Sequence, residues 1–354
     1  MFEIVKYLMS RERAGLRRSI AGVYSVLLVI NVLAWGWALL VFRTQPLLLG
    51  TALLAYGFGL RHAVDADHIA AIDNVTRKLM QEGKRPATVG FFFAMGHSTV
   101  VILAAAAIAA TATALASRFE GLRSVGGIIS TSVSALFLLL IAAMNLVIFR
   151  SVWQTFRHVR SGGAYVDEDL DLLLNQRGFA ARLFRPLFRF VKHSWHMFPL
   201  GFLFGLGFDT ATEVALLGIS ATQASQGTSV WVIMVFPALF AAGMSLIDTT
   251  DGVLMLGAYD WAFVKPMRKL FYNMTITLVS VIVAVLIGGI EALGLIREQL
   301  HLSGRFWDVV SDLNGNFNGL GFAIIGIFAL TWATSLIVYR YKGYDALEVR
   351  GAGE

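Results

Sequence analysis

Long apolar runs alternate with short polar segments along almost the whole chain. Eight of these runs cover residues 20–42, 47–72, 88–116, 125–149, 196–222, 229–258, 273–296 and 318–340. A helix needs about 20 mainly apolar residues to cross a bilayer core of about 30 Å, and each run reaches that length. The pattern therefore predicts an all-α polytopic membrane protein with eight transmembrane helices, in a single transmembrane domain over residues 1–354.

The composition supports a membrane protein. Hydrophobic residues make up 57% of the chain and charged residues only 15%. The first apolar run is too long for the core of a signal peptide and lacks a cleavage site of small residues, so we expect it to remain as a span. Cysteine is absent, which excludes disulfides and thiolate metal sites.

Basic residues concentrate in alternate connections between the runs. Of the 29 lysines and arginines, 23 lie in the two tails or in the connections after runs two, four and six, Arg77 and Lys78 among them. Five lie in the other connections, and Arg61 lies inside run two. By the positive-inside rule, both termini are predicted to be cytoplasmic. This topology also explains the net charge of +6, so the charge does not indicate a nucleic-acid partner.

The connection over residues 150–195 is the longest polar segment and is predicted to be a cytoplasmic loop. An acidic stretch at 167–171 precedes a basic and aromatic stretch at 179–195. The second stretch favours an amphipathic helix at the inner leaflet. A regulatory or docking element is the alternative.

An internal similarity relates two parts of the chain. Phe58-Gly-Leu60 returns as Phe204-Gly-Leu206, an offset of 146 residues, and Phe93-Ala-Met-Gly96 returns as Phe240-Ala-Ala-Gly243, an offset of 147. Three runs separate each matched pair, so the two copies cross the membrane in opposite directions. We therefore predict an inverted repeat of spans 2–4 against 5–7, with a substrate site at the repeat interface.

Run two carries a dense cluster of ionisable residues. Arg61, His62, Asp65, Asp67 and His68 fall within eight residues. Each such group costs about 2.5–3.5 kcal/mol at the centre of an inserted helix, so the cluster needs a partner that offsets this cost. A divalent transition-metal ion crossing the membrane is the predicted partner.

Helical geometry limits how this cluster can bind an ion. At about 100° per residue, His62, Asp65 and His68 share one face of a helix, whereas Asp67 points away from it. Either Asp67 orients a histidine without binding the ion, or the helix is distorted. A break after Gly59 is expected, because glycine allows backbone conformations that other residues avoid.

Another histidine, His97, lies inside run three. Counting residues from the cytoplasmic ends of the spans places His97 and His62 at similar depth, so we expect them to converge. Imidazoles with carboxylates suit Ni²⁺, Co²⁺, Zn²⁺ or Cu²⁺, whereas Mg²⁺ and Ca²⁺ prefer oxygen ligands alone. The predicted metal residues are His62, Asp65, Asp67, His68 and His97.

Runs five and six contribute further carboxylates and threonines within the membrane. These residues favour a second cation site, a gate or a proton relay, and hydrogen bonding between helices is the alternative. The candidates for the transport path or a second site, with three neighbours of the histidines, are Arg61, Ser98, Thr99, Asp209, Thr210, Thr212, Glu213, Asp248 and Asp251.

Four motifs resemble the signatures of the nickel/cobalt transporter family. They cover residues 61–68, 96–100, 206–213 and 243–251, and read RHAVDADH, GHSTV, LGFDTATE and GMSLIDTTD. The chain as a whole is most similar to the high-affinity nickel permeases. The resemblance implies uptake of Ni²⁺, with Co²⁺ as a competing substrate, across the bacterial inner membrane. It also implies functional roles for the five predicted metal residues.

The prediction is therefore a secondary transporter that imports nickel by alternating access. It is expected to be neither an enzyme nor dependent on a cofactor. No Walker-type phosphate-binding motif is present, so no use of ATP is expected. An intramembrane metal-dependent enzyme, such as a lipid hydrolase, is the alternative. The sequence carries no signal for an oligomeric state.

Overall fold

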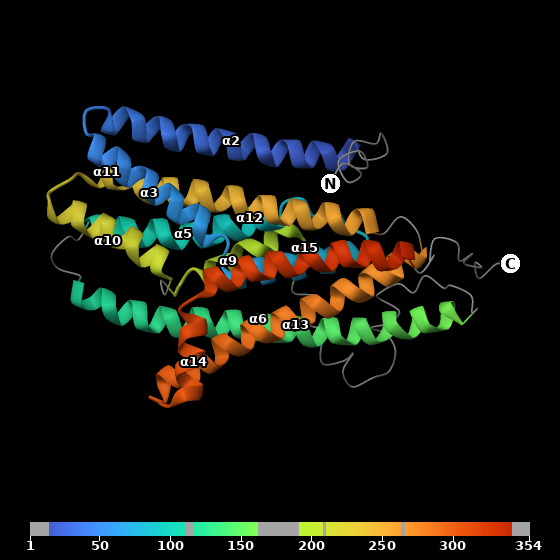
Figure 1. Cartoon of the computed structure of the whole chain (residues 1–354). Coiled ribbons are helices and arrows are strands. Elements are labelled where there is room, and N and C mark those ends of the chain that lie inside the picture. Colours follow the sequence, from blue (N-terminus) through green and yellow to red (C-terminus); the bar gives the residue numbers. More distant parts are fainter. Residues whose placement is uncertain (1–13, 111–115, 162–190, 208–209, 263–265, 342–354) are drawn as a thin grey trace.

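The computed structural model describes residues 14–110, 116–161, 191–207, 210–262 and 266–341, and this part of the chain contains helices and no strands. The helices form an elongated bundle (Figure 1). Their bounds are α2 Ala14–Phe42, α3 Pro46–His62, α4 Ala66–Gln81, α5 Val89–Ala110, α6 Ala116–Arg160, a 3₁₀ turn Ser194–His196, α9 Met197–Phe204, α10 Ala211–Ser225, α11 Val230–Ile233, α12 Val235–Ala262, α13 Pro266–Gln299, α14 Arg305–Asn314 and α15 Phe317–Tyr341.

Five helices of the described residues are long and apolar enough to cross a membrane by themselves. They are α2, α5, α6, α12 and α13, and two bent pairs, α3 with α4 and α14 with α15, raise the number to seven. The predicted span at 196–222 is divided between α9 and α10, which have 8 and 15 residues. At about 1.5 Å per residue, each is too short to cross a bilayer core of about 30 Å.

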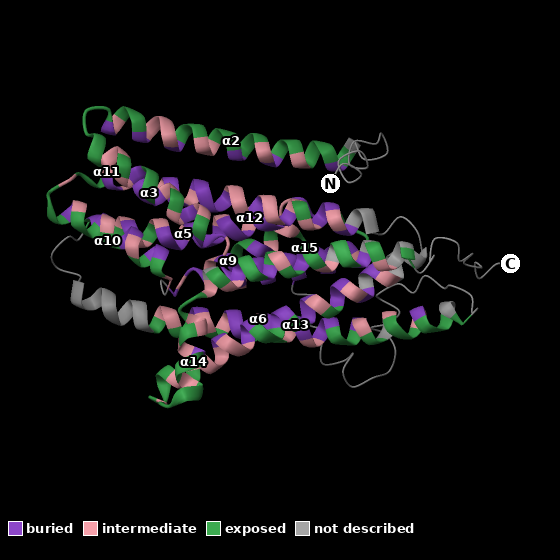
Figure 2. Cartoon of the chain, viewed as in Figure 1, coloured by how far each residue is buried: buried purple, intermediate pink, exposed green. Residues whose placement is uncertain are grey.

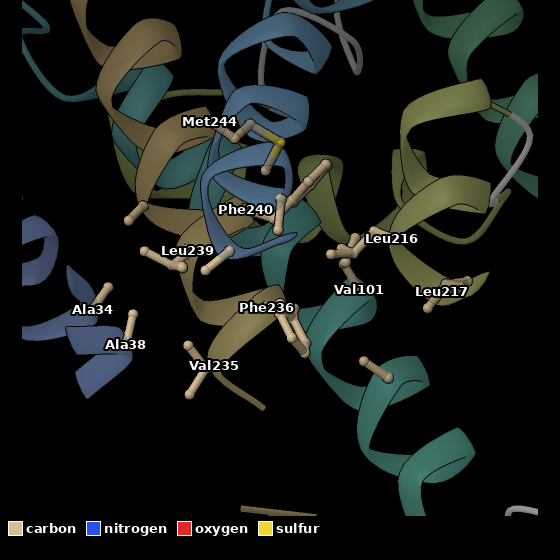
Figure 3. Packing of buried hydrophobic residues seen from close by; sticks show 14 of the residues in the cluster. Ala34, Ala38, Val101, Leu216, Leu217, Val235, Phe236, Leu239, Phe240 and Met244 are labelled. Carbon is tan, nitrogen blue, oxygen red and sulfur yellow. The ribbon is translucent and has the colours of Figure 1, made fainter. Parts of the chain in front are cut away.

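Helix α12 lies at the centre of the bundle, against α3 and α5. Its residues Phe236, Leu239 and Phe240 pack with Val101 of α5 and Leu216 of α10 (Figure 3). This apolar cluster holds α3 and α5 against α12, and the histidines lie on α3, α4 and α5.

The outer surface of the bundle is apolar. Leu28, Leu33 and Leu40 on α2 are 65%, 66% and 75% exposed, and exposed residues dominate the outward side of α2 (Figure 2). Such a surface is unfavourable in water but matches the hydrocarbon of a bilayer. The exposure pattern therefore agrees with a membrane protein.

Glycines allow α3 and α12 to approach at backbone distance. A Cβ atom on Gly59 would lie 2.1 Å from the carbonyl oxygen of Phe240, and one on Gly243 would lie 2.7 Å from that of Tyr56. Small residues at helix contacts are typical of membrane bundles, where close van der Waals packing replaces the hydrophobic effect between helices.

The break in run two falls later than expected. Helix α3 continues through Gly59 to His62, and α4 begins at Ala66 with a bend of 52°. The predicted break after Gly59 is therefore present, but Gly59 itself stays helical, and its missing side chain serves the contact with α12. Gly321 of α15 covers the break, since a Cβ atom there would lie 1.6 Å from the Val64 carbonyl oxygen.

Helix α4 also extends further than the sequence suggested. Arg77 and Lys78, assigned above to a connection, lie within α4 and are only 1% and 2% exposed. The Lys78 ammonium donates to the Val191 carbonyl, and that of Lys84 donates to the Lys192 carbonyl at 2.8 Å. The end of α4 thus holds the chain where it re-enters the bundle. Most of the predicted 150–195 loop, including its possible amphipathic helix, lies outside the described residues.

Substituting Gly59 tests the close packing of α3 on α12. We expect Gly59→Ala to destabilise the protein by about 1–3 kcal/mol, because the added methyl group meets backbone that cannot move independently. Thermal unfolding of the purified protein in detergent measures this. Gly57→Ala is the matched control, since a Cβ atom at Gly57 meets no atom within 4 Å. Equal stability of the two variants would contradict the packing argument.

Candidate metal site

Three buried histidines meet where the broken helix faces α5. His62 ends α3, His68 lies in the first turn of α4 and His97 lies in the middle of α5. One ring nitrogen of each lies within 4.8 Å of the others, and the residues are 2%, 0% and 3% exposed. The structure therefore brings together the histidines that the sequence singled out.

The spacing of two of these nitrogens suits a shared metal ion. The Nε2 atoms of His62 and His97 lie 3.0 Å apart. Two ligands at right angles around a metal, with metal–nitrogen bonds of about 2.1 Å, would lie about 3 Å apart. Nitrogen-rich sites of this kind bind divalent transition metals in preference to Mg²⁺ or Ca²⁺.

Hydrogen bonds at its other nitrogen orient the His62 ring. Asp65, the first residue before α4, places Oδ2 2.9 Å from His62 Nδ1. The hydroxyls of Thr212 and Thr210 lie 3.3 and 3.4 Å from the same nitrogen. Such contacts fix a ligating histidine and increase its basicity. In this geometry Asp65 contacts His62 on the side of the ring that faces away from His97.

His68 is held in the same way from another helix. The Asp248 carboxylate of α12 lies 3.2 Å from His68 Nδ1, while His68 Nε2 is buried and has no hydrogen-bond partner among the described residues. A buried polar atom without a partner is uncommon in folded proteins. This nitrogen is therefore free to bind a metal ion.

Glu213 is an additional carboxylate at the histidine cluster. Its Oε1 lies 2.9 Å from His97 Nε2 and 3.8 Å from His62 Nε2. The Thr210 hydroxyl donates to Oε2 at 2.8 Å. From the sequence, Glu213 was expected on the transport path or in a second site, and its closeness to the histidines was not foreseen. A signal was available, because the offset of 146 residues matches Glu213 with Asp67.

The remaining candidates near the histidines differ in their surroundings. Asp67 lies in the first turn of α4 and is partly buried. Ser98 is buried, and its hydroxyl has no hydrogen-bond partner among the described residues. The Thr99 hydroxyl donates to the Met95 carbonyl of its own helix at 2.7 Å. Arg61 is exposed in the last turn of α3.

The two remaining candidates lie in the predicted spans five and six. Asp251 lies one turn beyond Asp248 on α12, with a buried Oδ2 that has no hydrogen-bond partner among the described residues. Asp209 lies outside the described residues.

A bundle of membrane-length helices around buried, oriented imidazoles defines a polytopic membrane protein able to carry a transition-metal ion. Residues 48–338 match the family described as high-affinity nickel-transport protein, NicO. The match covers most of the chain, so this chain belongs to the NicO family of nickel transporters.

Individual relatives agree with this assignment. A high-affinity nickel transport protein of Cupriavidus necator is 59% identical over 99% of this chain and 100% of its own length. The nickel transporter NicT of Mycobacterium tuberculosis is 45% identical, over 90% of this chain and 88% of its own. The cobalt transport protein NhlF of Rhodococcus rhodochrous is 40% identical, over 92% and 94%. No solved structure matches the chain significantly.

These comparisons decide between a transporter and an intramembrane enzyme, the two classes of protein that the sequence left open. The relatives are named as transporters, which confirms the prediction of a transporter rather than an enzyme. The alternative of a metal-dependent lipid hydrolase finds no support among them.

Substituting Asp248 tests whether its bond to His68 prepares the site for metal. We expect Asp248→Asn to weaken Ni²⁺ binding by about 10- to 100-fold, because His68 loses the carboxylate that orients it. Equilibrium dialysis of the purified protein against ⁶³Ni²⁺ measures the affinity. Asp308→Asn on the exposed side of α14 is the control. Unchanged affinity in Asp248→Asn would remove Asp248 from the site.

Proposed function

We propose that this chain imports Ni²⁺ across the bacterial inner membrane as a secondary transporter, and that His62, His68 and His97 bind the ion. The convergence of three buried imidazoles at a helix break is the observation that carries this proposal. Membership of a nickel-transport family supports Ni²⁺ as substrate, and the cobalt-transporting relative supports Co²⁺ as a competitor.

Glu213 is proposed as a fourth ligand, and Asp65 and Asp248 as the carboxylates that orient His62 and His68. The contact of Glu213 Oε1 with His97 Nε2 supports its role. Imidazoles must be neutral to bind a metal ion, so a buried divalent ion needs carboxylates close by to offset the loss of its hydration. Asp67 is proposed to complete the ion's surroundings from the first turn of α4.

Eight membrane crossings are proposed, with α9 and α10 together forming the fifth. Helix α2 begins and α15 ends at the same end of the bundle (Figure 1), which requires an even number of crossings. The five single helices and two bent pairs supply seven, and the α9–α10 segment would supply the eighth.

The inverted repeat is supported by matching helix contacts. A Cβ atom on Gly243 of α12 would lie 2.7 Å from the Tyr56 carbonyl oxygen of α3. Its counterpart on Gly96 of α5 would lie 2.8 Å from the backbone nitrogen of Phe202 on α9. Both pairs are related by the offsets found in the sequence. The second helices of the two copies, α4 and α10, also follow extended residues with the same ψ of 145°.

A cytoplasmic location is proposed for both termini. Without Arg77 and Lys78, which the structure places inside α4, 21 basic residues remain on the predicted cytoplasmic side against five on the other. This asymmetry still satisfies the positive-inside rule.

Transport is proposed to proceed by alternating access. The histidines are almost completely buried, so the structure resembles a closed state that must open to each side in turn. Rocking of the repeat halves would expose the site at their interface. A membrane potential of 100 mV, negative inside, favours entry of a divalent ion by about 4.6 kcal/mol, from about 2.3 kcal/mol per charge.

Uptake by purified protein in liposomes tests this function. With an inside-negative potential, the wild-type protein is expected to accumulate ⁶³Ni²⁺, and excess Co²⁺ is expected to reduce the rate. His62→Ala and His68→Ala are expected to abolish uptake while inserting normally. His158→Ala, at an exposed position of α6, is expected to transport normally.

Two results would contradict the proposal. Wild-type liposomes that accumulate no nickel would exclude transport. Near-normal uptake by either histidine variant would exclude that histidine as an essential ligand.

A further inference from the structure

A second buried polar cluster lies along α4 beyond the histidines. It contains Asp73 and Arg77 of α4, Asp251 and Tyr259 of α12, and Ser280 of α13. At about 1.5 Å per residue, Asp73 lies about 7.5 Å beyond His68 along the helix and Arg77 about 6 Å further. In the proposed orientation this direction leads towards the cytoplasm.

Asp73 is the centre of this cluster. The residue is fully buried. The Tyr259 hydroxyl donates to its Oδ1, and the Ser280 hydroxyl donates to its Oδ2 at 2.7 Å. Hydrogen bonds to a charged acceptor are stronger than those between neutral groups. These bonds connect α4 to α12 and α13.

Arg77 supplies a positive charge that is incompletely paired. Its side chain is buried, and Nη2 donates to Asn74 Oδ1 at 3.0 Å. Its Nε and Nη1 atoms are buried without hydrogen-bond partners among the described residues. The positive charge of the guanidinium attracts the negative charge of the Asp73 carboxylate. Burying an ionisable group inside a membrane protein has an unfavourable free energy, so the burial of Arg77 needs a functional explanation.

Asp251 connects the cluster to the histidine site. It interacts electrostatically with both Asp73 and Asp248, and Asp248 is bonded to His68. Its Oδ2 is buried and has no hydrogen-bond partner among the described residues. Carboxylates therefore continue from the histidines through Asp248 and the partly buried Asp251 to Asp73, while Arg77 is the cation at the far end.

We propose that Asp73 and Asp251 form a second cation site, with oxygen ligands, on the cytoplasmic side of the histidine site. This inference rests on the proposed transport of Ni²⁺. The divalent ion enters this site as it leaves the histidines, and Arg77 balances the carboxylates when no metal ion is bound there. Oxygen ligands suit a Ni²⁺ ion less well than imidazole does, so such a site would hold the ion weakly enough for release.

Asp251→Asn tests whether Asp251 binds the cation or only makes a polar contact between helices. The change keeps the size of the side chain and removes its charge. Affinity for ⁶³Ni²⁺ at the histidine site, measured by equilibrium dialysis, is expected to stay within about twofold of wild type. The initial uptake rate in liposomes is expected to fall at least tenfold. The control Asp308→Asn, exposed on α14, is expected to match wild type in both.

Arg77→Gln gives an independent measurement. Removing the competing positive charge should strengthen metal binding between Asp73 and Asp251, so the purified variant is expected to bind two Ni²⁺ ions where wild type binds one tightly. The double variant Arg77→Gln/Asp251→Asn is expected to return to one. Arg43→Gln, at an exposed arginine, is the control and should bind one.

The results distinguish a failure of the second-site proposal from a failure of the proposed function. A wild-type uptake rate in Asp251→Asn, or a single bound Ni²⁺ in folded Arg77→Gln, would overturn the second site while leaving nickel import intact. A loss of affinity in Asp251→Asn as large as that in His97→Ala would also overturn it, by assigning Asp251 to the histidine site. If the wild-type protein binds nickel but does not transport it, the proposed function itself fails.

Discussion

The interruption of helix geometry between His62 and Ala66 is the constraint on which the histidine site depends. In a regular helix, two histidines six residues apart lie about 120° apart around the axis. The break lets their rings come within 4.7 Å, centroid to centroid. Hydrocarbon cannot hydrogen-bond the backbone groups that a break releases, so the break requires cover from protein. Gly321 of α15 provides it at the Val64 carbonyl.

Carboxylates set the orientation and the electrostatic surroundings of these histidines. Asp65 and Asp248 occupy one nitrogen of His62 and His68, and Glu213 approaches His97 from α10. Asp65 lies in the break before α4, Asp248 on α12 and Glu213 on α10, so any relative movement of these segments would change the site. Binding of a cation and the arrangement of the bundle are thereby coupled, as alternating access requires.

Features that depend on local chemistry could be predicted from the sequence, whereas features that depend on contacts between distant segments could not. Membrane helices follow from apolar length, and the three histidines stand out because ionisable residues are rare in apolar runs. The position of the break did not follow, because Gly59 is used for packing against Phe240 rather than for flexibility. Nor did the burial of Arg77, because a basic residue near the end of an apolar run usually marks a connection.

The sequence by itself determined the helical class, the basic asymmetry of the connections and the three histidines that meet inside the bundle. These properties depend on composition and spacing along the chain. Only the tertiary structure decided which carboxylate serves which histidine, because Glu213 and Asp248 lie more than 100 residues from their partners His97 and His68. The burial of Arg77 beside Asp73 was decided in the same way, by the packing of several helices around α4.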